Sequence, residues 1–206
     1  KVVTILTEVI VDKNDPAFSA PTKPVGPYYL KEEADLLAKT NNWLFKEDAR
    51  NRGWRRVVAS PKPLDIVNKD IICELARQGY IVIAGGGGGI PVYIDENNTH
   101  RPIEDAVIDK DLASALLANQ INADAFYILT DISKVCINFN KPDQQELDFL
   151  KVDDAKKYIA EGQFPMGSMG PKIMAAVNFT ENSGRPTIIT EAGKLEDPSC
   201  GTKIIR

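Results

Sequence analysis

From residue 64 to the last residue, short apolar runs alternate with stretches in which apolar residues recur at helical spacing. In the segment 66–78 the apolar residues share one helical face, and Gly79 follows as a C-terminal cap. The continuous apolar run 80–84 is typical of a strand that is buried on both faces. The same reasoning predicts helices at 109–120, 153–161 and 171–180 and strands at 125–130 and 187–190. Such alternation indicates right-handed crossovers and an α/β fold, with helices on both faces of a mostly parallel sheet.

The first 63 residues follow a different pattern. Residues 2–11 form a β-branched run that predicts a strand, and this strand begins without a preceding turn or cap. The stretch 13–63 is polar and rich in turn residues, with a helix expected at 31–39 and a short strand at 43–45. We therefore expect three parts: a core strand in residues 1–12, a protruding subdomain in residues 13–63 and the main lobe in residues 64–206.

Composition and charge exclude several classes of function. The 206 residues include 25 basic and 29 acidic side chains, which give a net charge of −4, the wrong sign for a protein that binds phosphate backbones through a basic face. No apolar stretch approaches the roughly 20 residues that cross a bilayer. The three cysteines are far apart and form no CxxC motif, so neither a disulfide framework nor a zinc site is indicated. A soluble, cytoplasmic protein without a protein-bound metal is expected.

A run of five glycines, Gly85–Gly89, follows the predicted strand 80–84 directly. It is either a flexible turn or an anion-binding nest of backbone N–H groups at the carboxyl end of a strand. The spacing is not GxGxxG, and the sequence contains no GxxxxGK[ST]. Neither a dinucleotide-binding fold nor a P-loop is therefore supported.

Two lysines stand at the predicted starts of helices. Lys110 lies between Asp109 and Asp111, which would be a helix cap and a first-turn acid in any helix, but which can also hold the ammonium group as a phosphate clamp. Lys172 ends the small-residue loop 167–172, where Pro171 is the expected first residue of a helix. This loop is either an ordinary helix start or a second site of positive charge for an anion.

Lys23, between two turn residues, is a further candidate, although most loop lysines simply face solvent. Lysines on three elements together with a glycine nest suit phosphoryl transfer, in which the protein positions the reactants and stabilises negative charge. His100 is the only histidine, and no Ser–His–Asp arrangement can be assembled. Asp131, which follows the predicted strand 125–130, is either a turn residue or a nucleotide contact.

Taken together and in order, nine segments resemble the carbamate kinase family of the amino acid kinase superfamily. They span nearly the whole chain, and the proline–lysine segments are more specific than the glycine run. The segments are Asp15–Phe18, Pro21–Pro24, Trp54–Val58, Ser60–Pro63, Gly86–Pro91, Ala106–Asp111, Ile128–Asp131, Gly167–Lys172 and Cys200–Thr202.

The resemblance implies a three-layer α/β/α fold and reversible phosphoryl transfer between ATP and carbamate, with Mg²⁺, in a homodimer that often makes ATP in arginine fermentation. It implies catalytic roles for Lys110 and Lys172 on the transferring phosphoryl group, for Asp111 in orienting them, and for Lys23 on carbamoyl phosphate. It also makes residues 64–206 a nucleotide-binding lobe. The implied nucleotide contacts are Gly86, Gly87, Gly88, Asp109, Thr130, Asp131, Ser168 and Met169.

The chain departs from the family pattern in three places, one of which is Ala59, where the family usually has a proline. The family's N-terminal lobe, which binds carbamate, has no counterpart here, so we expect that the sequence covers part of a longer enzyme. A truncated relative that binds nucleotide without catalysis, or that only dimerises, is the alternative. The stretch 47–53 also carries extra residues where the family has a tighter turn.

Overall fold

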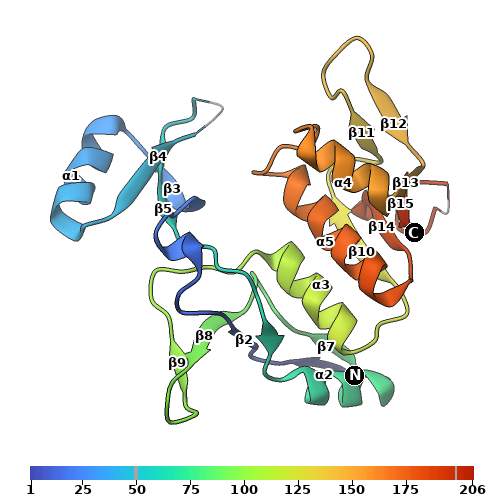
Figure 1. The fold of residues 1–206 in the computed structure, drawn as a ribbon, viewed down its shortest axis with the longest axis horizontal. Coiled ribbons are helices and arrows are strands. Elements are labelled where there is room, and N and C mark those ends of the chain that lie inside the picture. The colour runs from blue at the N-terminus through green and yellow to red at the C-terminus, as the bar shows by residue number, and fades with distance from the viewer. Residues whose placement is uncertain (49–50, 198) are drawn as a thin grey trace.

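The computed structural model describes residues 1–48, 51–197 and 199–206. Ala49 and Arg50, in the stretch with extra residues, lie outside them. Figure 1 shows an α/β body and a smaller unit that stands away from it. The strands of the body are β1 Val2–Thr4, β2 Glu8–Ile10, β6 Asp65–Ile66, β7 Ile81–Ile83, β8 Ile90–Ile94, β9 His100–Pro102, β10 Phe126–Thr130, β11 Val135–Ile137, β12 Gln145–Leu147, β13 Phe149–Lys151, β14 Thr187–Glu191 and β15 Thr202–Ile205. Its helices are α2 Lys69–Arg77, α3 Lys110–Gln120, α4 Val152–Ala160, α5 Met169–Ser183 and the short η2 Ala192–Lys194.

In each parallel pair of the body, one or more helices lie between the two strands in the sequence. β1 pairs with β7, β2 with β8, β10 with β14, and β13 with β15, each pair in parallel. Antiparallel pairing brings β6 and β9 beside the β2–β8 pair, and β14 beside β15. The predicted helices and strands after residue 64 are thus confirmed, and the body also contains β8, β9, β11, β12, β13 and β15, which the sequence pattern did not predict.

The apolar run 2–11 forms two strands rather than the single predicted strand. Between β1 and β2, the Thr7 hydroxyl donates to the Ile5 carbonyl at 3.0 Å, and the Thr7 carbonyl accepts the Ile90 N–H at 2.9 Å. The chain therefore stops pairing with β7 after β1 and pairs with β8 from β2 onward. This change of partner places Thr7 at the start of the glycine run, where it matters for the site.

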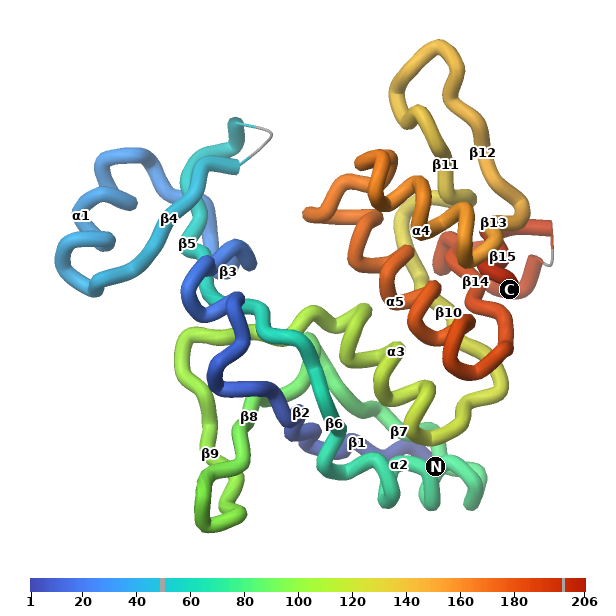
Figure 2. Tube along the Cα trace, in the orientation of Figure 1, coloured from blue at the N-terminus to red at the C-terminus, as the bar shows by residue number. Residues whose placement is uncertain are grey.

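The smaller unit is built from the polar stretch between the body strands. It contains the 3₁₀ turn η1 Pro16–Phe18, the helix α1 Lys31–Asn41, and a three-stranded antiparallel sheet in the order β3 Lys23–Tyr29, β5 Trp54–Val58, β4 Leu44–Glu47. In Figures 1 and 2 this unit projects from the body, and the chain enters and leaves it near β2 and β6. We call it the subdomain. The proposed boundaries at residues 13 and 63 stay a prediction.

Two apolar clusters form the core of the body, and α3 contributes to both. Ala115 and Ala118 of α3 pack with α4, α5 and β10, whereas Ala113 packs with the cluster around Val9 and Ile66. Because neighbouring residues of one helix are locked in two clusters, the N-terminus of α3 is held firmly. That end carries the candidate lysine and its two aspartates.

Two local expectations are wrong. The strand 80–84 is not buried on both faces, since α2 packs against β7 but Ile81 and Ile83 are 66% and 51% exposed. Pro171 is the third residue of α5 rather than its first, because the helix begins at Met169. A proline is tolerated throughout the first turn, where the N–H groups have no partner within the helix.

Candidate functional site

The start of α3 and the start of α5 bring two lysines to one carboxylate. The Lys172 ammonium group donates to both oxygens of Asp111, at 3.0 and 3.2 Å. Lys110 Nζ lies 3.8 Å from the same carboxylate. The side chains of Lys172 and Asp111 are only 14% and 11% exposed, whereas that of Lys110 is 61% exposed. The geometry thus gives one buried, oriented ammonium group and a second that is free to reach into solvent.

Asp109 connects the subdomain to the same helix end. One oxygen of its carboxylate caps α3 by accepting the N–H groups of Asp111 at 2.9 Å and Leu112 at 3.4 Å. The other oxygen pairs with the Lys23 ammonium group, which comes from β3. Burial alone would raise the pKa of Asp109, but the hydrogen bond and charge of Lys23 and the capping N–H groups hold that pKa below its ordinary value. Asp109 therefore stays ionised and fixes Lys23 beside α3.

The glycine run lies against this helix end. A Cβ at Gly88 would lie 2.1 Å from the Ile108 carbonyl oxygen, and a Cβ at Gly89 would lie 2.4 Å from Cγ2 of Val9. Both also have positive φ, of 138° and 88°, so glycine is required for close packing at these two positions. Part of the run is thus structural, and Gly88 touches the residue before Asp109.

The remaining glycines leave backbone donors open. Within the described residues, the N–H groups of Gly86 and Gly87 have no hydrogen-bond partner, and a Cβ at either would meet nothing within 4 Å. The Gly85 N–H donates to the Thr7 hydroxyl at 2.8 Å. Thr7 is 4% exposed and holds the run in place. The sequence reasoning missed this role because a threonine within a predicted strand gives no distinctive signal.

The predicted nucleoside contacts lie at two element ends. Thr130 and Asp131 follow one another at the end of β10, where the Thr130 hydroxyl donates to the Asp131 carboxylate at 3.2 Å. Ser168 precedes α5, and Met169, one turn before Lys172, packs on the larger core cluster. Among the described residues, no hydrogen bond or ion pair joins these four to the lysines. Their nucleotide role stays a prediction.

Comparison with known proteins identifies the family. Residues 27–191 match the model of the amino acid kinase family. The chain belongs to the amino acid kinase family. It is 49% identical over 208 residues to carbamate kinase from Thermococcus kodakarensis, with 100% of this chain and 65% of that protein covered. It is 50% identical to carbamate kinase from Clostridium perfringens, with 98% and 65% covered.

Solved structures of this family confirm the α/β fold. Carbamate kinase from Giardia lamblia bound to AMP-PNP superposes with a TM-score of 0.85 at 45% identity, covering 99% of this chain and 65% of that one. The chain therefore spans about 65% of the length of the curated relatives named above. Within the described residues, no helix combines the length and apolar character needed to cross a membrane.

The site gathers positively charged groups and backbone donors at one helix end. Lys23, Lys110 and Lys172 converge on the start of α3, with Asp109 and Asp111 between them and open backbone N–H groups in the adjoining glycine run. Ammonium groups and backbone N–H groups that are fixed before the substrate arrives stabilise charge on a phosphoryl group without reorganisation. Such a set of positive groups is chemically suited to an anion of phosphate type.

Proposed function

We propose that the protein is a carbamate kinase, which catalyses ATP + carbamate ⇌ ADP + carbamoyl phosphate. The observation that carries the proposal is the pairing of Lys172 with Asp111, beside Lys110 and the open N–H groups of the glycine run. The substrate class rests on relatives that are named carbamate kinases and that share about half of their aligned residues with this chain.

The proposed mechanism assigns each group a task in one displacement. In the direction of ATP formation, a β-phosphate oxygen of ADP attacks the phosphorus of carbamoyl phosphate, the P–O bond to the carbamoyl group breaks, and carbamate leaves with that electron pair. Lys110 and Lys172 donate hydrogen bonds to the transferring phosphoryl oxygens, and Asp111 orients both ammonium groups. Lys23 binds the carbamoyl phosphate from the subdomain side. Electrostatic stabilisation and positioning supply most of the catalysis in such transfers.

The nucleotide is proposed to lie across the glycine run and the ends of β10 and α5. The open N–H groups of Gly86 and Gly87 would face its phosphates, with Gly88 and Asp109 nearby. The Gly88 N–H itself donates to the Gly85 carbonyl at 2.8 Å and closes the turn. Its nucleoside part would meet four residues at the two element ends: Thr130, Asp131, Ser168 and Met169. A glycine-rich loop at the carboxyl end of a strand is a common place for phosphates in open α/β sheets.

Mg²⁺ belongs to the proposal because the ion commonly neutralises the charge between nucleotide phosphates. Within the described residues, no group of three His, Cys, Asp or Glu side chains is placed to hold a metal, and Asp109 and Asp111 are each paired with a lysine. The phosphates would therefore supply most of its ligands, with a carboxylate as at most a minor partner. A cytoplasmic homodimer that makes ATP in arginine catabolism completes the proposal.

A coupled assay tests this function. Carbamoyl phosphate and ADP are added with Mg²⁺, and ATP formation is followed with hexokinase and glucose-6-phosphate dehydrogenase, for the 206-residue chain and for any longer product of its gene. Lys110→Met is the matched negative control. ATP formation that depends on Lys110 supports the proposal. No ATP formation from either protein, with ADP binding measurable by calorimetry, would instead identify a silent nucleotide-binding module.

A further inference from the structure

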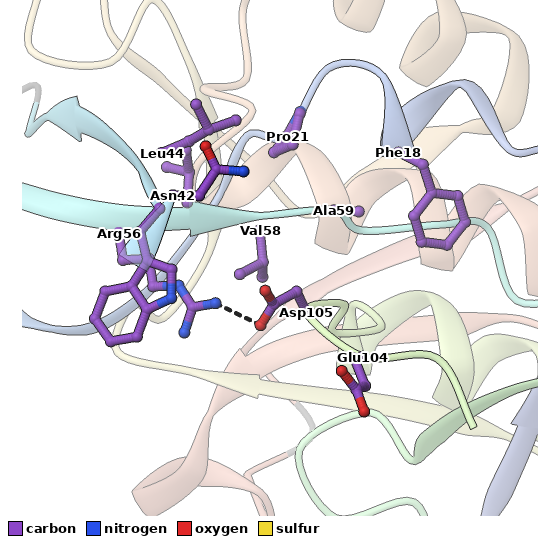
Figure 3. A pocket seen from close by; sticks show the side chains of 11 residues that line it. Phe18, Pro21, Asn42, Leu44, Arg56, Val58, Ala59, Glu104 and Asp105 are labelled. Atoms are coloured by element: carbon purple, nitrogen blue, oxygen red, sulfur yellow. Dashed lines mark hydrogen bonds and ion pairs between the residues drawn. The ribbon is translucent and has the colours of Figure 1, made fainter. Parts of the chain in front are cut away.

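The loop before α3 holds the subdomain at successive points. Arg56 of β5 forms an ion pair with Asp105 (Figure 3). Next to it, the Ala59 N–H donates to the Asp105 carbonyl at 3.3 Å, and the Val107 N–H donates to the Ala59 carbonyl at 3.0 Å. The Lys23–Asp109 pair follows, so one short loop carries these contacts and leads directly into Lys110.

Arg56 is fixed on both sides. Its guanidinium group stacks 4.0 Å from the ring centroid of Trp43, and its side chain is 20% exposed. Stacking on an aromatic face orients the planar group and reduces the entropy lost when it pairs with a carboxylate. Asp105 has a φ of 54°, a left-handed conformation that Asp and Asn adopt more readily than other residues. The guanidinium group is therefore oriented for this contact, whereas the Asp105 side chain is 70% exposed and meets it from the solvent side.

A cavity of about 190 Å³ lies where the subdomain meets the body, and the Arg56–Asp105 pair lies on its wall (Figure 3). Phe18, Pro21 and Leu44 line its apolar side, while Glu104 lies at the body edge. Tight packing normally fixes the position of one unit against another. Because a cavity replaces such packing here, the ion pairs and the backbone contacts of Ala59 have more influence on where the subdomain sits.

The sheet of the subdomain connects Arg56 with Lys23. Arg56 lies opposite Val25 in the antiparallel pairing of β3 and β5, and Lys23 is two residues away on the same strand, opposite Val58. A shift of β5 at Arg56 is thus transmitted through the ladder to Lys23. The ion pairs Arg56–Asp105 and Lys23–Asp109 thus hold the sheet of the subdomain at two points against the segment that leads into α3.

We propose that Arg56, through its ion pair with Asp105 and its stacking on Trp43, is a positioning residue that holds Lys23 over the lysines of α3 and α5. The inference rests on the proposed function and extends it, because Arg56 itself touches none of the proposed phosphoryl contacts. When the competent position is less populated, substrate affinity falls by the lost fraction, and saturating substrate restores that position. Loss of the pair should therefore raise KM for carbamoyl phosphate more than it lowers kcat.

Steady-state kinetics of Arg56→Gln and Asp105→Asn test this expectation. Asp105→Asn removes the charge while keeping a residue that tolerates the left-handed backbone. Because the Asp105 carboxylate is 70% exposed, Asp105→Asn should raise KM for carbamoyl phosphate about two- to fivefold. Arg56→Gln also loses the stacking on Trp43 and should raise it further, up to about tenfold. We expect kcat and the Kd of ADP, whose proposed contacts are on the body, each to change by less than about twofold. Arg52→Gln is the control, because Arg52 pairs with Asp48 inside the subdomain.

A double-variant cycle and a spectroscopic measurement complete the test. Because Asp105 acts through Arg56, the double variant should raise KM no further than Arg56→Gln alone. In a Trp54→Phe background, Trp43 is the only remaining tryptophan, and acrylamide should quench its emission more strongly in Arg56→Gln and in Asp105→Asn. This readout requires no turnover, so it separates the inference from the proposed function.

The possible results distinguish failure of the positioning role from failure of the kinase proposal. Unchanged KM in both variants of an active enzyme, or unchanged quenching of Trp43 in both, overturns the positioning role while leaving the kinase proposal intact. An equal rise of KM in Arg52→Gln also overturns it, since any loss of positive charge would then suffice. An inactive unsubstituted protein that still shows the quenching change counts against the kinase proposal and supports Arg56 as the contact that positions the subdomain.

Discussion

The buried pair between α3 and α5 provides the sharpest test of the site's architecture. Asp111→Asn keeps the shape of the side chain and removes the charge that two lysines share. Lys172, with its ammonium group 3.0 and 3.2 Å from the two oxygens, would lose its anionic partner although its side chain is only 14% exposed. We therefore expect the variant to lose stability as well as activity.

The size of the effect follows from burial. Removing one partner of a buried ion pair costs about 3–5 kcal/mol, since it leaves the other charge uncompensated. The residual exposure of 14% for Lys172 and 11% for Asp111 places this pair at the lower end, about 3 kcal/mol. For a chain of this size, that corresponds to a fall in Tm of roughly 6–12 °C. Turnover should fall on the order of 10²- to 10³-fold because Lys172 loses its orientation.

Calorimetry and the coupled assay measure the two effects together. Asp153→Asn is the matched control, because Asp153 is also the second residue of a helix, α4, but is exposed. In the double variant Asp111→Asn/Lys172→Met, the uncompensated charge is gone, so part of the lost Tm should return. A Tm for Asp111→Asn as close to wild type as that of the control would refute the buried-pair reasoning.

Other predictions separate structural from functional roles. Lys110→Met should lower turnover on the order of 10²- to 10³-fold. Because this side chain is 61% exposed, the free energy of unfolding should change by less than about 0.5 kcal/mol. A loss of stability as large as that of Asp111→Asn would contradict this prediction. Gly88→Ala should unfold well below wild type in a thermal scan, because its Cβ would lie 2.1 Å from a carbonyl oxygen, whereas Gly87→Ala should keep the fold and weaken ADP binding in calorimetry; equal Tm values would refute this contrast. Because the pKa of Asp109 is lowered in the folded protein, the stability that its charge provides is present at neutral pH and is lost as pH falls through the folded-state pKa. The difference in unfolding free energy between wild type and Asp109→Asn should therefore shrink in acid. A difference that grows as pH falls would show that the charge of Asp109 does not stabilise the folded protein.

The sequence predicts local features better than their partners. Helix-forming patterns and the cap at Asp109 locate α3 within one residue, because those signals lie within a few neighbouring positions. The boundary between β1 and β2 could not be predicted, since it depends on which strand pairs with each half of the run. The exposure of Ile81 likewise depends on what covers β7, which an apolar run does not reveal.

The site shows the same division. Lys110, Lys172 and the glycines were found because their residue types are unusual where they stand. The pairing of Lys23 with Asp109 joins residues 86 positions apart, and no spacing rule links them. Thr7 and Arg56 were missed for the same reason, because each acts through a contact between distant segments rather than through a motif.

The lysines differ in how firmly they are held, and this difference bears on the proposed catalysis. Lys172 is buried and bound to a carboxylate of its own lobe, whereas Lys23 is 35% exposed and bound to a carboxylate across the junction with the subdomain. Lys110 has its nearest carboxylate at 3.8 Å and extends toward solvent. A phosphoryl group entering this site would meet one ammonium group already in place and one that depends on the subdomain. Lys110 remains free to follow the group as it moves. Because preorganised charge stabilises a transition state most effectively, Lys172 and its partner Asp111 should be the least tolerant of conservative exchange.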